Sequence, residues 1–304
     1  MTISSNDGLG VNRLRAALQR LYNRVVLRDD KPFYLGDDAD WGMEYNTTDA
    51  TLLGPNPTGG VFEDAPNLSP VNFASAYWVA DHFTSFDQSD DGKWTSDATG
   101  GTAALSANEG GVLVLDGGGS SNNYINLVLS ANATPANAPF AMGDGGGSTV
   151  AQKKLWFEVK FKSSAATPAN CGFAVGLGGL EGSSNILEII ADDGSLQAKD
   201  FVGFRAKEDA ADEIDFTTAQ DGTASDVKAN IATHDDSYVR CGFVYDGSTT
   251  VTPYIDGSAS STNSVETDAT NFPGDEELVP VMCLKEGSGD FDEYIDYIVC
   301  IQLL

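Results

Sequence analysis

The sequence predicts a mainly β protein whose antiparallel strands pack as a jelly-roll β-sandwich. From about Tyr77 onward, short apolar runs, several of them alternating apolar with polar residues, are separated by turns rich in Gly, Asp, Ser and Asn. Short strands at such spacing, with turn residues between them, are typical of sandwiches and jelly rolls. No repeat of fixed period occurs, which argues against a solenoid or a propeller.

The run KLWFEVKFKSS at residues 154–164 shows the alternation most clearly. One face would carry Leu155, Phe157, Val159 and Phe161, and the other face Trp156, Glu158, Lys160 and Lys162. This pattern predicts a half-buried antiparallel strand. Similar runs predict further strands at residues 110–117, 123–130, 171–179, 186–193, 200–207, 237–247, 251–257, 279–286 and 292–303.

The first 75 residues differ from the rest in pattern. Apolar residues recur at helical spacing over 11–26, which predicts a short N-terminal helix. Residues 33–45 alternate on either side of Gly36-Asp37-Asp38, which predicts a hairpin. Residues 50–75 contain four prolines and several glycines and are predicted to be a linker or loop. We therefore expect an attachment arm at 1–75 and a sandwich domain at 76–304.

The net charge of −28 is unevenly distributed along the chain. Residues 1–31 carry six basic and three acidic residues, a net charge of +3, so the remainder carries −31. An acidic body disfavours binding to nucleic acid or to an anionic membrane, since both need clustered Lys and Arg. A basic arm on such a body suggests a partner of its own for the arm. A solvated helix face is the alternative interpretation.

Targeting signals and cysteine pattern favour a protein made in a reducing cytosol. No secretory signal peptide and no apolar stretch of 18 residues are recognised. The four cysteines lie in apolar strand-like runs without a CxxC pair. We expect buried free thiols rather than a zinc site, with disulfides as the alternative.

Several runs, taken in order, resemble a known sandwich family. DHFTSFDQSDDGKWTSDATGG at 81–101 resembles the first strand and turn of domains found in tailed-phage structural proteins. The runs GGVLVLDGG, KLWFEVKFK and YVRCGFVYDGSTTVTPYIDGS continue the pattern, and EYIDYIVCIQ at 293–302 resembles a closing strand. Residues 77–304 therefore resemble the concanavalin A-like (LamG-like) jelly roll.

The segment FYLGDDADWGMEYN at 33–46 resembles a short segment of phage virion proteins, which include capsid decoration (cement) proteins and tail adhesins. The resemblance implies a non-enzymatic decoration protein on the capsid exterior that binds the major capsid protein and neighbouring copies as a homo-oligomer. The residues expected to contact the shell are Arg13, Arg20, Arg24, Arg28, Tyr34 and Trp41. The alternative is a tail-fibre adhesin that binds a host glycan, for which Trp94, Trp156 and Tyr254 are candidates to stack on a sugar.

The concanavalin A-like fold also hosts glycosidases, whose signature places carboxylates on one strand as Glu-x-Asp-x-x-Glu or Glu-x-Asp-x-Glu. Glu213 and Asp215 match the first two positions, but Thr217 or Thr218 stands at the third. A retaining mechanism needs two carboxyl groups about 5 Å apart. His82 and His234 lie near no nucleophile motif. We therefore predict no enzymatic activity and no organic cofactor.

One acidic loop has the beginning of a calcium-binding pattern. Asp87, Ser89 and Asp91 stand at positions 1, 3 and 5, with Gly92 at position 6, but position 12 is Ala98 instead of a bidentate Glu. A solvated acidic turn is the simpler interpretation, and calcium at Asp87, Ser89 and Asp91 is the alternative.

Overall fold

The computed structural model describes residues 33–35, 41–45, 50–53, 60–62, 65, 76–86, 93–121, 123–129, 140–143, 153–179, 200–221, 223–274, 277–287 and 291–304. The chain divides into two compact units, residues 1–57 with 67–70, and residues 58–66 with 71–304. Within the described ranges, no helix is long and apolar enough to cross a membrane. The predicted helix at 11–26 and the predicted strand at 186–193 lie outside those ranges.

The first unit contains a small antiparallel sheet in the order β1-β2-β3, formed by β1 (Phe33–Leu35), β2 (Trp41–Tyr45) and β3 (Ala50–Leu53). The predicted hairpin is confirmed, because Phe33 pairs with Met43 and Leu35 with Trp41. The prediction of a loop from residue 50 was wrong for the first four residues. Ala-Thr-Leu-Leu is too short to display a period, and its pairing with β2 decides the structure.

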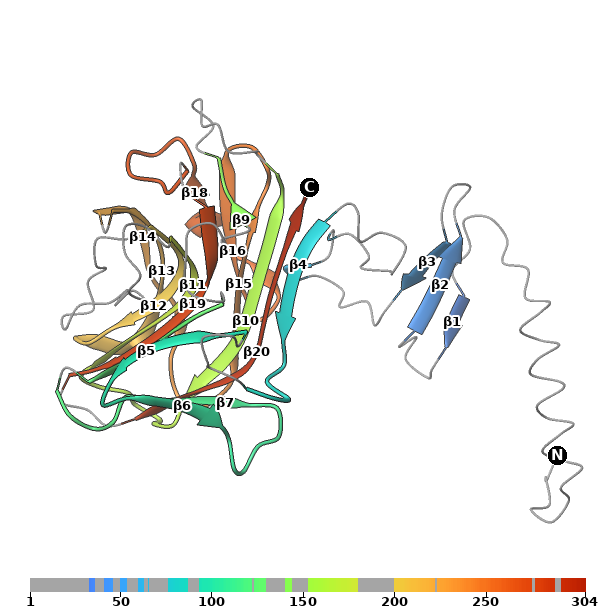
Figure 1. Cartoon of the computed structure of the whole chain (residues 1–304). Coiled ribbons are helices and arrows are strands. Elements are labelled where there is room, and N and C mark those ends of the chain that lie inside the picture. Colours follow the sequence, from blue (N-terminus) through green and yellow to red (C-terminus); the bar gives the residue numbers. More distant parts are fainter. Residues whose placement is uncertain are drawn as a thin grey trace, which may run out of the picture. The chain divides into compact units, whose positions relative to one another are not determined.

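The second unit is a sandwich of two antiparallel sheets (Figure 1). Sheet I has the order β17-β16-β15-β10-β20-β7-β6, with β18 beside β16 and β4 beside β20. Its strands are β4 (Ala76–Asp81), β6 (Thr102–Leu105), β7 (Leu113–Asp116), β10 (Leu155–Ser163), β15 (Val239–Tyr245), β16 (Thr250–Ile255), β17 (Ser258–Ala259), β18 (Val265–Glu266) and β20 (Asp292–Leu303).

Sheet II has the order β14-β13-β12-β11-β19-β8-β5, with β9 beside β19. Its strands are β5 (Thr95–Thr99), β8 (Tyr124–Val128), β9 (Phe140–Ala141), β11 (Cys171–Gly179), β12 (Phe201–Lys207), β13 (Ala210–Gln220), β14 (Thr223–Thr233) and β19 (Glu277–Glu286). A 3₁₀ turn, η3, spans Ser261–Asn263. The predicted fold class, an antiparallel β-sandwich, is confirmed.

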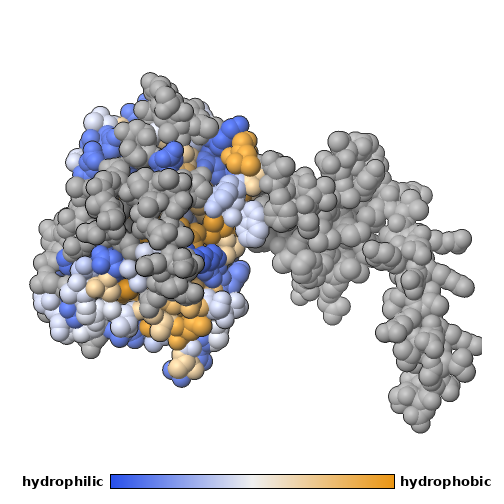
Figure 2. All heavy atoms as spheres, viewed as in Figure 1, coloured by the Kyte–Doolittle hydropathy of each residue, from blue (hydrophilic) through white to orange (hydrophobic). Residues whose placement is uncertain are grey.

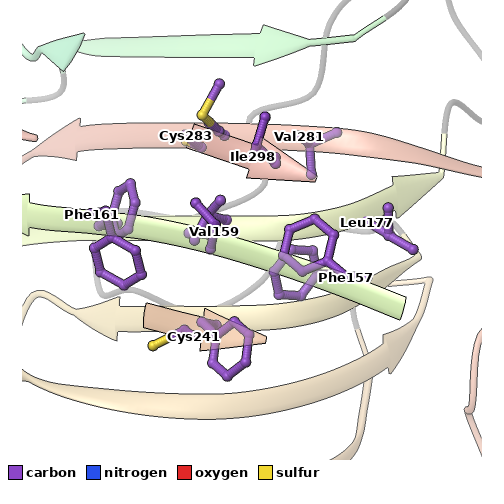
Figure 3. Close-up of a cluster of buried hydrophobic side chains, with 14 of the residues drawn as sticks. Phe157, Val159, Phe161, Leu177, Cys241, Val281, Cys283 and Ile298 are labelled. Carbon is purple, nitrogen blue, oxygen red and sulfur yellow. The ribbon is translucent and has the colours of Figure 1, made fainter. Parts of the chain in front are cut away.

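Alternation along β10 builds the core between the sheets. Phe157, Val159 and Phe161 point into the interior, as predicted (Figure 3). The opposite face was predicted to be solvated, and this is correct only for its second half. Lys160 and Lys162 are half-buried, whereas Trp156 and Glu158 are 1% and 7% exposed. Part of the outer face of sheet I is therefore covered.

The four cysteines are buried free thiols, as the sequence predicted. Cys241 and Cys300 face the core from sheet I, and burial raises the pKa of both thiols well above the ordinary value. Such thiols are protonated at neutral pH and behave as small apolar side chains.

The described surface of the sandwich is a mosaic of hydrophilic and hydrophobic residues on the face seen in Figure 2. The large hydrophobic side chains exposed among the described residues are Tyr77, Trp78, Leu105 and Leu304. Scattered exposure of this kind is normal for a folded domain and identifies no binding surface.

Candidate functional site

The candidate site is the outer face of sheet II, which the strand register defines. Phe173 of β11 packs against Phe161 of β10, with ring centroids 5.0 Å apart, so Phe173 points to the interior. Side chains alternate along a strand, and paired residues of neighbouring strands share a face. One cross-strand row on the outer face therefore contains Asp97, Asn126, Cys283, Ala174, Arg205 and Asp215.

The middle of this face carries only short side chains. The outward positions of β11 are Gly172, Ala174, Gly176 and Gly178. Gly176 pairs with Gly203 of β12, and a Cβ atom added to Gly176 would lie 2.3 Å from the carbonyl oxygen of Val202. The longer side chains of the face therefore come from β12 and β13 on one side and from β19 and β8 on the other.

The β12–β13 side is organised around Asp215, which is 2% exposed. Its Oδ2 atom lies 3.9 Å from Nε of Arg205 and 4.0 Å from Nζ of Lys207. Its Oδ1 atom accepts a hydrogen bond of 2.9 Å from the main-chain N–H of Asn230. The Asn230 side chain donates to Glu213 Oε1, also at 2.9 Å. Both carboxylates are thus held as ion-pair and hydrogen-bond acceptors.

The third carboxylate position of the glycosidase signature is filled by threonine in either spacing. Thr217 shares the outer face with Glu213 and Asp215, because side chains two and four residues apart point the same way. Thr218 pairs with Val202, which shares its face with Leu177 in the interior, so Thr218 points inward. A hydroxyl cannot replace the second carboxyl of the retaining mechanism. The strand therefore carries the first two acids of the signature and lacks the third in either spacing.

The β8–β19 side contains a buried amide without a hydrogen-bond partner in the part of the chain that the structure describes. Asn126 is 1% exposed, and neither its Nδ2 nor its Oδ1 atom has a hydrogen-bond partner among the described residues. Asn126 pairs with Asp97 on one side and Cys283 on the other. The Asp97 carboxylate accepts a hydrogen bond of 3.3 Å from the Tyr124 hydroxyl. The amide thus presents a donor and an acceptor that none of the described residues uses.

We predict that Asn126→Leu raises the free energy of unfolding by about 1 kcal/mol, because an unpartnered buried polar group costs about 1–3 kcal/mol. Chemical denaturation of the two proteins measures the difference. The control is Thr95→Val on the neighbouring strand β5, where a polar residue is also replaced by an apolar one. A loss of 1 kcal/mol or more in Asn126→Leu would contradict the view that the amide is unpartnered.

The sequence-predicted contact residues fall mostly outside the described ranges. Arg13, Arg20, Arg24 and Arg28 lie outside them, and so do the calcium candidates Asp87, Ser89 and Asp91. Tyr34 pairs with Gly42, and Trp41 pairs with Leu35, so these two contact candidates belong to one hairpin. Among the described residues, no group of three or more His, Cys, Asp or Glu side chains converges on a metal position.

The candidate sugar-stacking tryptophans are not available for that role. Trp94 and Trp156 are each 1% exposed, and the Trp94 indole donates a hydrogen bond of 2.8 Å to Asp81. Tyr254 is half-buried on β16. His82 is exposed, whereas His234 is fully buried beside Glu293. The structure thus brings neither histidine to the outer face of sheet II.

Arg205, Lys207 and Asn126 were not selected from the sequence. The only local indication of a site is a polar residue on one face of an otherwise apolar strand, as in FVGFRAK. That pattern is equally expected for a face exposed to solvent. What unites them is the pairing of strands far apart in the chain.

The fold has counterparts among solved structures, although no protein-family model and no curated protein matches the sequence. Peanut lectin aligns with a TM-score of 0.50 and 13% identity over 75% of this chain and 98% of the lectin. A protein of unknown function from Shewanella oneidensis aligns with a TM-score of 0.49 and 15% identity, over 76% of this chain and 87% of that protein. A carbohydrate esterase of bacteriophage phi24B aligns with a TM-score of 0.43 and 17% identity, over 74% of this chain and 97% of the esterase.

The similarity to peanut lectin is one of architecture. The alignment with peanut lectin shows that the chain contains a lectin-like, concanavalin A-like β-sandwich, as the sequence resemblance implied. At such low identity the likeness is one of fold, and function has to be argued from the residues of this chain.

Proposed function

We propose that this protein is a non-enzymatic decoration protein of a tailed-phage capsid, which binds the outer shell through its N-terminal arm and stabilises it. The observation that carries the proposal is the match between charge and structure. Residues 1–31, with a net charge of +3, belong to the first unit, whereas the rest of the chain carries −31 and includes the sandwich. A basic segment at the start of the first unit suits an attachment element, and the acidic sandwich suits a separate exposed body.

The proposed mechanism uses binding energy alone. Arms that order on docking can cover large areas and connect the major capsid protein with neighbouring copies. A protein that binds only the assembled shell stabilises it by mass action. The strong negative charge of the bodies keeps them soluble and apart. The threonines that follow Glu213 and Asp215, where the glycosidase signature has its last glutamate, support a role without hydrolysis.

We predict that deleting residues 1–35 lowers association with purified capsids at least about tenfold, since the basic arm supplies the contacts. Co-sedimentation of the purified protein with capsids measures association. The sandwich should keep its thermal unfolding transition, because it forms a separate compact unit. Unchanged co-sedimentation of the truncated chain would rule out attachment through the arm.

The second candidate is a tail-fibre adhesin that binds a host glycan on the outer face of sheet II. The observation in its favour is the polar row of Asn126, Arg205 and Asp215, in which the Asn126 amide has no hydrogen-bond partner among the described residues. These side chains are 1%, 9% and 2% exposed, so contact with a sugar requires that this face become accessible. A glycan array probed with wild type and Asn126→Leu separates the two functions. Specific sugar binding that Asn126→Leu abolishes would favour the adhesin, whereas no sugar binding together with normal capsid association would favour decoration.

A further inference from the structure

A valine upstream of the sandwich strands is buried on the outer side of sheet I. Val61 belongs to the sandwich unit and is 2% exposed. Val61 lies against Gly242 of β15. The next residue, Phe243, points into the core, so Gly242 faces outward. Val61 therefore packs outside the core, against the back of sheet I.

Gly242 forms the slot that accepts this valine. It lies in a cross-strand row between Glu158 of β10 and Tyr254 of β16, so a gap in the side-chain layer opens where the glycine stands. A Cβ atom added to Gly242 would lie 2.4 Å from Cγ2 of Val61. Glycine inside a strand is unfavourable unless something approaches closely, and here the approaching group is the Val61 side chain.

The residues that surround the slot are largely buried. Trp156, Val244 and Ile301 form the neighbouring row of the same outer face, and they are 1%, 9% and 4% exposed. On the same face, Lys160 has 31% of its side chain exposed. The segment at Val61 is fixed by a turn in which the N–H of Ala65 donates to the carbonyl of Phe62 at 3.1 Å.

We propose that Val61, seated on Gly242, is an anchor that holds its own segment of the chain on the outer face of sheet I. Val61 stands in the stretch 58–66, which follows residues 1–57 of the first unit directly in the chain. This anchor does not depend on the proposed attachment function.

The test uses a glutamate-specific endoprotease on the full-length protein. Glu63 follows Val61 by two residues and is the one glutamate between Glu44 and Glu109 in the sequence. Cleavage there yields residues 64–304, which mass spectrometry identifies. We expect Val61→Asp to raise the initial rate of this cleavage about tenfold or more. The reason is that burial of the Val61 side chain opposes the local opening that the protease needs. Val61→Ala should give a smaller increase.

Two controls fix the interpretation. Val61→Ile retains an apolar group in the slot and should be cleaved at the wild-type rate. Val114→Asp makes the same change on the outer face of sheet I at β7, away from the slot, and should leave cleavage at Glu63 unchanged. Equal rates for wild type, Val61→Asp and Val61→Ala would overturn the anchor. Because no capsid is present, failure of capsid binding leaves this result untouched and counts against the proposed function alone.

Discussion

Replacing His234 by leucine is expected to lower the free energy of unfolding by about 3–5 kcal/mol at pH 7. The imidazole and the Glu293 side chain are both fully buried, with Nε2 2.7 Å from Oε1. The other ring nitrogen, Nδ1, lies 2.6 Å from the carbonyl oxygen of Ala211, so an imidazolium can donate to both acceptors. Removing His234 leaves a buried carboxylate without its counter-charge. Urea denaturation measures the loss.

A double-mutant cycle separates pairing from packing. The double variant His234→Leu/Glu293→Leu should lose less stability than His234→Leu alone, because no unpaired charge remains. The matched control is the ion pair between Lys160 and Asp296, which spans 2.6 Å with both side chains 31% exposed. Lys160→Ala should cost only about 0–1 kcal/mol, since exposed pairs are weak. Strictly additive effects at His234 and Glu293 would contradict a coupled pair.

The pair also sets a pH dependence. Burial alone would lower the pKa of His234, but the charge and hydrogen bond of Glu293, with the Ala211 carbonyl, raise it above 6.5. Burial raises the pKa of Glu293, which His234 only partly opposes. Both groups therefore hold protons more tightly in the folded protein, so stability falls as pH rises. The His234 contribution is complete below pH 6.5 and is lost as pH rises through its folded-state pKa.

This dependence is measured by thermal unfolding at pH 6 and at successively higher pH values. As pH rises, the melting temperature of the wild type should fall relative to that of His234→Leu/Glu293→Leu. A difference in melting temperature that is constant with pH would show that the pair does not titrate in this range.

Phe243→Ala is expected to lower the free energy of unfolding by about 3–5 kcal/mol, the usual cost of removing a buried phenylalanine ring. Phe243 is fully buried and stacks on Phe157 of sheet I with ring centroids 5.0 Å apart. Its ring also lies 5.8 Å from Phe216 and 6.4 Å from Phe204 of sheet II. The ring thus joins the two sheets, and its loss leaves a cavity between them.

Graded substitution distinguishes a cavity from general unfolding. Phe243→Leu should cost less than Phe243→Ala, since it fills part of the space. The control is Leu105→Ala on β6, where the leucine is 41% exposed and the change should stay within about 0.5 kcal/mol. Equal losses at Phe243 and Leu105 would mean that the aromatic contacts do not hold the sheets together.

The fold class could be predicted because strong patterns are local. Residues 157–162 alternate between apolar and polar side chains, so both the strand and its inward face follow from the sequence. In contrast, β14 reads TASDVKANIAT, without a period, and its pairing with β13 shifts register twice. Its position at the edge of sheet II is decided by tertiary pairing, which overrides weak local preference.

The candidate site was predictable only in part for the same reason. The motif around Glu213 and Asp215 was visible, because both residues belong to one strand. Asn126 and Arg205 join the same row only through the register of β8, β19, β11 and β12. The contact between Val61 and Gly242 could not be predicted from the sequence, since a glycine within an apolar run can mark a bulge, a turn or a close approach of another segment.

A cryo-EM reconstruction of intact phage particles that carry this protein tests the central proposal most directly. The account predicts sandwich-shaped density on the outside of the capsid, with the N-terminal segment in contact with the shell and the acidic body facing solvent. Density for the sandwich at the tip of a tail fibre, with none on the capsid, would contradict it and favour the adhesin.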